Sequence, residues 1–318
     1  MSEPTGDKAM AARVSPPPGD AVPGEPPWPA LDTVERAVLA RMPQSTRRPF
    51  VIGLSGAQGS GKSTLSAALE ARLNAAGIRT VTLSIDDLYL TKAAREVLAI
   101  EVHPLLRARG VPGTHDLGLG FAVLAALDLG DSAALPRFDK AHDDRAELAR
   151  WGKADADTQV LILEGWCVGA VPEAPAALEH PVNALERDED PDGVWRRYVN
   201  AALAGDYQQL FSRIDFLALL EAPGFEIVQT WRLQQEHALR DRVGAGAGVM
   251  DDAQVARFIQ HYERLTRHIL KEMPGRADLV IALNEDRSAR SISFHETWIP
   301  VRNADPAYRD HRRKQGRS

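Results

Sequence analysis

The chain has 318 residues, 44% of them hydrophobic, and carries a formal net charge of -6 at pH 7. A chain of this charge has no global basic footprint, which argues against nucleic acid as its main partner. No apolar stretch approaches the roughly 18 residues that a membrane span requires, so we predict a cytoplasmic protein. The single cysteine, Cys167, excludes an intramolecular disulfide framework, and we expect it to be a small buried hydrophobe.

A proline-rich stretch opens the chain and a short basic segment ends it. Residues 1–45 lack the hydrophobic region of a secretory signal and cannot form a packed core, so we predict a disordered leader. We predict one domain over residues 46–300 and a solvated basic tail over residues 301–318. The acidic, proline-containing stretch 172–193 is interpreted as an excursion on that domain rather than a linker between two domains.

Five short runs rich in valine, isoleucine and leucine follow one another along the predicted domain. Their continuous apolar character is typical of strands that are buried on both faces, as in a parallel sheet. The runs are residues 49–56, 79–87, 158–166, 214–222 and 277–286.

Helical patterns separate these runs. The helix after the first run has apolar residues at helical spacing, and Gly77 is placed to end it. The pattern over residues 251–275 predicts a second helix, which Asp251 or Asp252 can cap and Pro274-Gly275 can end. Alternating strands and helices favour a doubly wound α/β domain, in which ligands bind at the carboxyl ends of the strands.

The segment "GAQGSGKS" matches the phosphate-binding pattern G-x-x-x-x-G-K-[ST], between a predicted strand and a predicted helix. Glycines let the backbone turn tightly so that its amides approach anionic oxygens, and the helix start adds partial positive charge. Lys62 supplies a full charge, and Ser63 is a ligand for Mg²⁺. The predicted nucleotide-binding residues are Gly56, Ala57, Gln58, Gly59, Ser60, Gly61, Lys62, Ser63 and Thr64.

Acidic residues stand at the ends of the next two predicted strands. Asp86 and Asp87 follow the second run, and Glu164 lies at the end of the third. Phosphoryl transfer from ATP needs Mg²⁺ on the β- and γ-oxygens and a carboxylate that receives the acceptor's hydroxyl proton. Asp86 and Glu164 can fill these roles. An alternative is that the Asp86-Asp87 pair caps a helix.

Several segments in one order carry a resemblance to a known family: "GLSGAQGSGKSTL", "SIDDLYLT", "HPLLRARGVPGTHDL", "LPRFDKAHDDR", "VLILEGW" and "WRLQQE". Together they resemble the motifs of plant-type D-glycerate 3-kinases. They are more distantly similar to uridine kinase, phosphoribulokinase and pantothenate kinase. The resemblance spans residues 49 to 285. It implies a P-loop NTPase-type α/β fold, doubly wound, with a mainly parallel sheet, helices on both faces and a helical lid.

This resemblance assigns roles to single positions. It implies that Asp86 is the general base and that it also contacts Mg²⁺. The other residues expected to hold the metal are Ser63 and Glu164. The residues implied at the acceptor pocket are Asp87, Tyr89, His115, Asp116, Arg137 and Lys140.

A small acid such as glycerate calls for a guanidinium fork on its carboxylate and hydrogen bonds to its hydroxyls. Arg137 is a candidate fork, and His115 and Asp116 can bind hydroxyls. An ordinary surface position for Arg137 is the alternative.

Arg232, Glu236 and Arg240 are spaced at i, i+4 and i+8 on a predicted helix. A solvated ladder of ion pairs explains this spacing without any function. The resemblance instead implies that Arg232 is a catalytic arginine on a lid over the phosphates. The following "GAGAG", residues 244–248, is compatible with lid movement.

The leading hypothesis is an ATP- and Mg²⁺-dependent kinase that makes 3-phosphoglycerate from D-glycerate. The sequence departs from the plant pattern after "PRFDK" and after "EGW", which leaves a nucleoside, a pantothenate-like acid or a sugar phosphate as alternative acceptors. A non-catalytic nucleotide-binding switch is a further alternative. However, "LNED" at residues 283–286 lacks the lysine of a guanine-binding Asn-Lys-x-Asp segment. The sequence does not predict an oligomeric state.

Overall fold

The computed structural model describes residues 28–45, 48–243 and 250–295 of the chain. Its centre is a six-stranded sheet in the order β10-β9-β8-β1-β7-β2. Five strands run parallel, and β10 pairs antiparallel with β9. The strands of this sheet are β1 (Phe50–Gly56), β2 (Thr80–Ser84), β7 (Val160–Gly165), β8 (Phe216–Glu221), β9 (Leu279–Leu283) and β10 (Ala289–Phe294). The five predicted strands and the mainly parallel sheet are therefore confirmed.

Strand β1 lies between β8 and β7 inside the sheet, and every one of its seven residues is buried. Ile52 lies opposite Ile162 of β7 on one side and Phe216 of β8 on the other. From β1 the chain first builds β2 and β7 on one side and only later crosses to β8 on the other. The strand order therefore reverses at β1, and in a parallel sheet such a reversal opens a crevice at the carboxyl ends.

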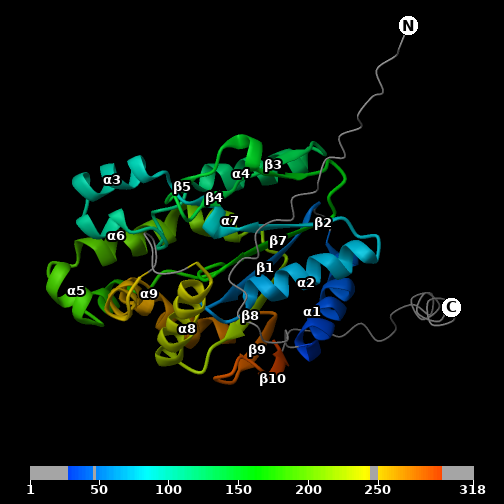
Figure 1. The fold of residues 1–318 in the computed structure, drawn as a ribbon. Coiled ribbons are helices and arrows are strands. Elements are labelled where there is room, and N and C mark those ends of the chain that lie inside the picture. The colour runs from blue at the N-terminus through cyan, green and yellow to red at the C-terminus, as the bar shows by residue number, and fades with distance from the viewer. Residues whose placement is uncertain (1–27, 46–47, 244–249, 296–318) are drawn as a thin grey trace, which may run out of the picture.

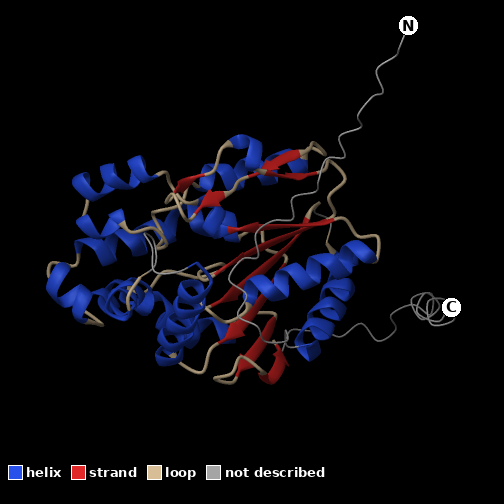
Figure 2. Ribbon diagram, in the orientation of Figure 1, coloured by secondary structure: helices blue, strands red, loops and turns tan. Residues whose placement is uncertain are grey.

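Helices cover the sheet on both faces. Helices α1 and α2 pack together on one side of the strands, and α4 and α7 contact each other on the opposite side (Figures 1 and 2). The helices are α1 (Trp28–Arg41), α2 (Lys62–Ala75), α3 (Lys92–Glu101), α4 (Leu117–Asp128), α5 (Ala184–Glu189), α6 (Val194–Ala202), α7 (Gln208–Phe211), α8 (Phe225–Val243) and α9 (Asp252–Glu272). As predicted, Gly77 follows α2 with a φ of +80°, and Asp251 caps α9 in a capping box. None of the described helices is both long and apolar enough to cross a membrane.

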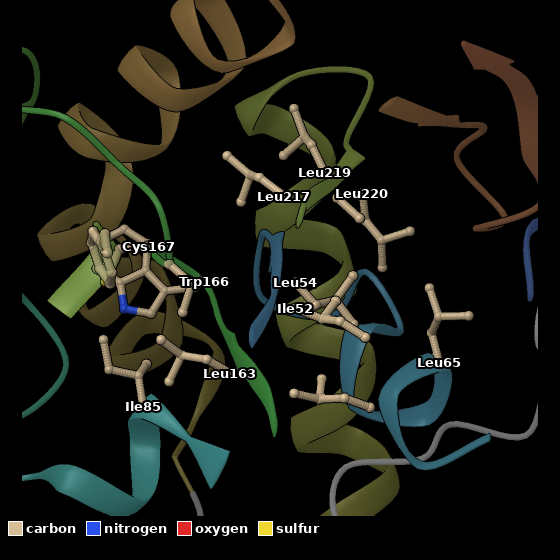
Figure 3. Close-up of a cluster of buried hydrophobic side chains, with 14 of the residues drawn as sticks. Ile52, Leu54, Leu65, Ile85, Leu163, Trp166, Cys167, Leu217, Leu219 and Leu220 are labelled. Carbon is tan, nitrogen blue, oxygen red and sulfur yellow. The ribbon is translucent and has the colours of Figure 1, made fainter. Parts of the chain in front are cut away.

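The core lies between these layers. Figure 3 shows Ile52 and Leu54 of β1 grouped with side chains from neighbouring elements, among them Leu65 of α2. Cys167 has no exposed surface, and burial raises the pKa of its thiol well above the usual range. The expectation that this residue is a buried hydrophobe is thus confirmed, and its neutral thiol is unsuited to nucleophilic chemistry.

The prediction of a disordered leader is wrong from residue 28 onward, because residues 28–41 form α1. Leu31, Val34 and Val38 recur at helical spacing and are completely buried. Arg72 of α2 also pairs with Glu35 of α1 at 3.0 Å. The many prolines upstream concealed this short amphipathic pattern. The leader up to residue 27 and the tail from residue 301 lie outside the described residues.

Sequence reasoning also missed the edge strand and two small antiparallel sheets. Residues of β10 are mostly exposed, so they lack the apolar run that marked the central strands. The small sheets pair β3 (Ala133–Leu135) with β6 (Gly152–Ala154), and β4 (Phe138–Asp139) with β5 (Asp144–Arg145). Segments of two or three residues are too short for periodicity to reveal them.

The stretch 172–193 docks on α9. Arg264 of α9 forms a buried ion pair with Glu186 of α5 at 2.6 Å. The same guanidinium donates to the carbonyl oxygens of Ala177 and His180. The polar character of this stretch therefore reflects a network of internal hydrogen bonds with the helix.

We expect Leu31→Ala to lower the free energy of unfolding by about 2–5 kcal/mol, because it opens a cavity in a fully buried part of α1. Denaturant unfolding followed by circular dichroism measures the change. Arg36→Ala on the exposed side of the same helix is the control and should change stability by about 0.5 kcal/mol or less. Equal effects of the two substitutions would contradict the packing of α1 on the core.

Candidate active site

The loop Gly56–Lys62 joins the central strand β1 to the start of α2, as the motif requires. Gly59 and Gly61 have φ angles of +80° and +89°, in the left-handed region that favours glycine. The amide of Ser60 donates to the carbonyl oxygen of Ala57 at 3.1 Å. This tight turn ends at the α2 N-terminus, where free amides and the helix dipole favour an anion. Lys62 is the first residue of that helix, and Ser63 and Thr64 follow it.

Two residues that sequence reasoning missed hold the middle of this loop. A Cβ atom on Gly59 would lie 2.6 Å from Cβ of Trp231, so the loop and α8 are in direct contact. Arg287, in the turn between β9 and β10, donates to the carbonyl oxygen of Gly59 at 2.6 Å and to Gln234 of α8 at 2.8 Å. Because that carbonyl is bound from outside, the loop is fixed by elements more than 150 residues further along the chain.

Asp86 lies in a single helical turn, Ile85–Leu88, immediately beyond β2 rather than in the strand. Its carboxylate accepts from Lys140 at 3.0 Å and from the Tyr89 hydroxyl at 2.6 Å. Burial raises the pKa of Asp86, but the charges of Lys140 and Lys62 and these hydrogen bonds outweigh it and hold the pKa well below its usual range. The carboxylate is therefore an anion whose charge is balanced by lysines.

Asp87 faces the neighbouring segment instead. It accepts from Arg137 at 2.9 Å and from the backbone amide of Phe138 at 3.0 Å, and burial raises its pKa. The turn is capped by Ser84, whose hydroxyl accepts from the Asp86 amide, so neither aspartate serves as the cap. Asp87 and Arg137 thus tie β4 to the end of β2.

Glu164 is the next-to-last residue of β7 and lies beside the start of α2, where its carboxylate meets Ser63. The Ser63 hydroxyl donates to its Oε1 at 3.3 Å, while its Oε2 is buried without a hydrogen-bond partner among the described residues. Burial raises the pKa of Glu164, and the nearby Lys62 charge opposes this rise. A serine hydroxyl next to an incompletely satisfied carboxylate is a fitting place for a divalent cation.

The part of the chain that the structure describes contains no group of three or more His, Cys, Asp or Glu residues arranged to hold a metal. Mg²⁺ is commonly bound by one or two carboxylates, the phosphates of its substrate and several waters, and Ser63 and Glu164 offer one hydroxyl and one carboxylate.

An antiparallel bridge between Tyr89 and His115 brings the acidic turn to the predicted acceptor segment. The two rings lie 4.8 Å apart, and Phe138 packs edge-on against Tyr89 at 5.1 Å. Asp116 accepts from Arg145 at 2.8 Å. The six residues implied at the acceptor pocket therefore lie in one connected neighbourhood of contacts around Asp86.

The predicted ladder on α8 is present only in part. Arg232 pairs with Glu236 at 2.8 Å, whereas Arg240 donates to the carbonyl oxygen of Met250. The Arg232 guanidinium lies 5.8 Å from the ring centre of Phe258 on α9, and its Nε is buried without a partner among the described residues. Arg232 is thus held in place by the α8–α9 pair. The "GAGAG" segment lies outside the described residues.

Buried polar atoms that lack a hydrogen bond gather around this site. Such atoms cost free energy in a folded protein unless a ligand or water satisfies them, so a cluster of them marks a binding site. Most of those found in the described residues belong to the phosphate loop, its strand, the acidic residues and the cationic side chains nearby. They are Ser55 Oγ, Gln58 Oε1, Ser60 Oγ, His115 Nε2, Arg145 Nε, Glu164 Oε2 and Arg232 Nε.

A phosphate loop at the reversal point of a parallel sheet, with carboxylates at the carboxyl ends of two further strands, defines a P-loop nucleotide-binding protein. A family model described as the phosphoribulokinase / uridine kinase family matches residues 51–174. An uncharacterized kinase, mug58, of Schizosaccharomyces pombe is 40% identical over 235 residues, which are 70% of this chain and 82% of that protein. The chain therefore belongs to the phosphoribulokinase / uridine kinase family of P-loop kinases, which implies that it uses ATP.

Two further relatives carry a more specific name. The chloroplastic D-glycerate 3-kinase of Arabidopsis thaliana is 31% identical over 258 residues, which are 76% of this chain and 54% of the plant protein. A solved structure of D-glycerate 3-kinase from Cryptococcus neoformans is 27% identical with a TM-score of 0.70 and covers 83% of this chain and 99% of that one. The resemblance to the glycerate kinase group is thus confirmed in sequence and in fold.

We expect Gly59→Ala to raise the dissociation constant for ATP by about tenfold or more, because the loop must distort to make room for the methyl group. A distortion that costs about 1.4 kcal/mol of binding free energy corresponds to a factor of ten. The added methyl group would clash with Trp231. Gly77→Ala is a matched control, since Gly77 has the same φ of +80° but no atom within 4 Å of the added carbon. It should cost about 1 kcal/mol of stability. Its ATP affinity, measured by calorimetry, should not change, and an equal loss in both variants would contradict the role of the contact.

Proposed function

We propose that this kinase transfers the γ-phosphoryl group of ATP to a small hydroxy acid, with D-glycerate as the acceptor and 3-phospho-D-glycerate as the product. The observation that carries the proposal is a row of three cations from one short segment, each paired with a carboxylate of the acidic turn or of the predicted acceptor segment. The pairs are Arg137–Asp87, Lys140–Asp86 and Arg145–Asp116. The likeness to two D-glycerate 3-kinases supports the same acceptor.

These ion pairs suit an acidic acceptor on physical grounds. The three cations are partly exposed, so their ion pairs add little stability and a change of carboxylate partner costs little. A carboxylate of the acceptor can therefore replace an internal carboxylate on Arg137, Lys140 or Arg145. Arg137 and Arg145 add planar donors that fit a carboxylate with two hydrogen bonds. A neutral nucleoside would gain nothing from this exchange.

Ser63 and Glu164 are the residues that would hold Mg²⁺, with Asp86 close enough to act electrostatically on both Glu164 and Lys62. When bound, the cation neutralises charge on the β- and γ-phosphate oxygens. Lys62 and the backbone amides of the phosphate loop would bind the phosphates of ATP. Arg232 is proposed to stabilise the transferred phosphoryl group through its guanidinium, whose Nε has no partner among the described residues.

Asp86 is proposed to orient the acceptor's hydroxyl and to receive its proton. The acceptor oxygen forms a bond to the γ-phosphorus as the bond from phosphorus to the β-phosphate oxygen breaks, and ADP leaves. With its pKa held low, Asp86 is a weak base and takes the proton only when bond formation makes the hydroxyl acidic. Movement of Lys140 from Asp86 to the acceptor's carboxylate would raise the pKa of Asp86 and strengthen it as a base.

The proposed acceptor is tested by a coupled assay for ADP release with ATP, Mg²⁺ and a panel of D-glycerate, L-glycerate, uridine, pantothenate and ribulose 5-phosphate. We expect turnover with D-glycerate and the formation of 3-phosphoglycerate, identified by mass spectrometry and a specific second enzyme. Turnover with uridine alone would overturn the charge-exchange argument. ATP binding without turnover on any acceptor would favour the nucleotide switch.

Asp86→Asn is expected to lower kcat by roughly 10²–10⁴-fold, because it removes the proton acceptor while preserving shape. ATP should still bind, since the phosphate loop is unchanged, and calorimetry checks this. Near-normal turnover of the variant would exclude Asp86 as the base. Thermal unfolding of both proteins shows whether the substitution has disturbed the fold.

A further inference from the structure

His115 is held in one orientation by a tyrosine from another element. The side chain is 6% exposed, and its Nδ1 lies 2.5 Å from the hydroxyl oxygen of Tyr207. The two rings meet edge-on with their centres 5.7 Å apart. Tyr207 ends the segment Leu203–Tyr207, which joins α6 to α7 across a kink at Gly205. No motif in the sequence pointed to Tyr207.

The hydrogen bonds of Tyr207 determine where its proton goes. The backbone amide of Gly113 donates to its hydroxyl oxygen at 3.0 Å. Burial raises the pKa of Tyr207 well above its usual range, so the hydroxyl keeps its proton, although amide donors oppose the rise. The backbone amide of His115 also acts as a donor to this oxygen, so both of its lone pairs are occupied and its proton is left for the short contact to Nδ1 of His115. Nδ1 of His115 is therefore an acceptor and carries no proton.

The neutral imidazole must then carry its proton on Nε2. Burial lowers the pKa of His115 to about 4, so the ring is neutral at physiological pH. Its Nε2 is buried and has no hydrogen-bond partner among the described residues. A buried N–H donor without an acceptor is destabilising, which is the signature of a group reserved for a ligand or an ordered water.

His115 is one side chain away from the proposed base. Its ring stacks on Tyr89, and the Tyr89 hydroxyl binds Asp86 at 2.6 Å. The negative charge of Asp86 also acts on the imidazole. Asp86 and His115 thus belong to one connected set of side chains, and we expect a molecule whose hydroxyl reaches Asp86 to place its neighbouring atoms near Nε2.

We infer that Tyr207 is a positioning residue that fixes His115 as the Nε2–H tautomer, and that this N–H binds an oxygen of the acceptor next to the hydroxyl that is phosphorylated. The inference rests on the proposed function, since it concerns the same acceptor pocket. A fixed N–H donor selects acceptors that present a lone pair there, such as a second hydroxyl or a carboxylate oxygen. It selects against an N–H group at that position, because two donors would then face each other.

The tautomer can be measured without any acceptor by long-range ¹H–¹⁵N NMR of the uniformly labelled chain. The signals of His115, one of nine histidines, are those missing from the His115→Gln variant. We expect the wild type to show an unprotonated Nδ1 and a protonated Nε2. A protonated Nδ1, or an average of the two tautomers, would overturn the inference, and it would do so whatever molecule the enzyme phosphorylates.

Kinetics then test the role of the tautomer, using the acceptor that the panel identifies. Tyr207→Phe should raise the acceptor KM by about three- to tenfold and leave the KM for ATP unchanged, because it frees the tautomer but removes no ATP contact. Tyr198→Phe is the matched control. Tyr198 packs against the same Gly113, and its hydroxyl makes no hydrogen bond among the described residues. An equal rise of the acceptor KM in both variants would mean that Tyr207 contributes only packing, and it would contradict the inference.

Amide variants of His115 separate the two ring positions. Glutamine places an N–H₂ group near the position of Nε2, whereas asparagine places one near Nδ1. We expect His115→Gln to keep the acceptor KM within about threefold of the wild type and His115→Asn to raise it about tenfold or more. The reverse order would overturn the assignment of Nε2 as the donor. If D-glycerate is inactive but another acceptor gives this order, the proposed acceptor fails and the inference stands.

Discussion

The structure depends on the balance of negative charge at one edge of the sheet. Asp86, Asp87 and Glu164 lie beside a loop that is built for phosphates, and ATP would bring further negative charge. Two like charges about 4 Å apart repel by about 4 kcal/mol at an effective dielectric constant of about 20. The nearby charges of Lys62, Lys140 and Arg137 offset this repulsion.

Because the cations are already paired, the proposed acceptor would bind by replacing an internal carboxylate on one of them, rather than by filling an unoccupied donor. Lys140 is half-exposed, so its pair with Asp86 adds little stability and can be replaced at small cost. The ion pair of Arg264 with Glu186 is buried, and breaking it would leave an uncompensated charge. Partly exposed ion pairs thus lie around the proposed acceptor pocket, while the buried ion pair attaches residues 172–193 to α9.

Much of the fold and part of the site could be predicted from the sequence. The central strands have continuous apolar runs, and the phosphate loop has fixed spacing, so both leave a local signal. Arg287 and Tyr207 left none, and Trp231 stands in the segment "WRLQQE" without a role of its own, because the roles of all three come from contacts with residues far away in the chain. The same limit explains why α1 was not predicted. A 14-residue helix is stabilised mainly by packing on a core, and its weak apolar pattern does not reveal that core.

His115 shows why a motif names a residue but not its chemistry. A histidine can donate, accept or carry a charge, and its sequence neighbours do not decide among these states. Here burial removes the charge, and Tyr207 occupies the accepting nitrogen. What remains is a neutral donor next to an anionic base that is itself paired with a lysine. The proposed hydroxy acid would satisfy all three groups at once, since its carboxylate would meet the lysine, its reacting hydroxyl the base and its second hydroxyl the donor.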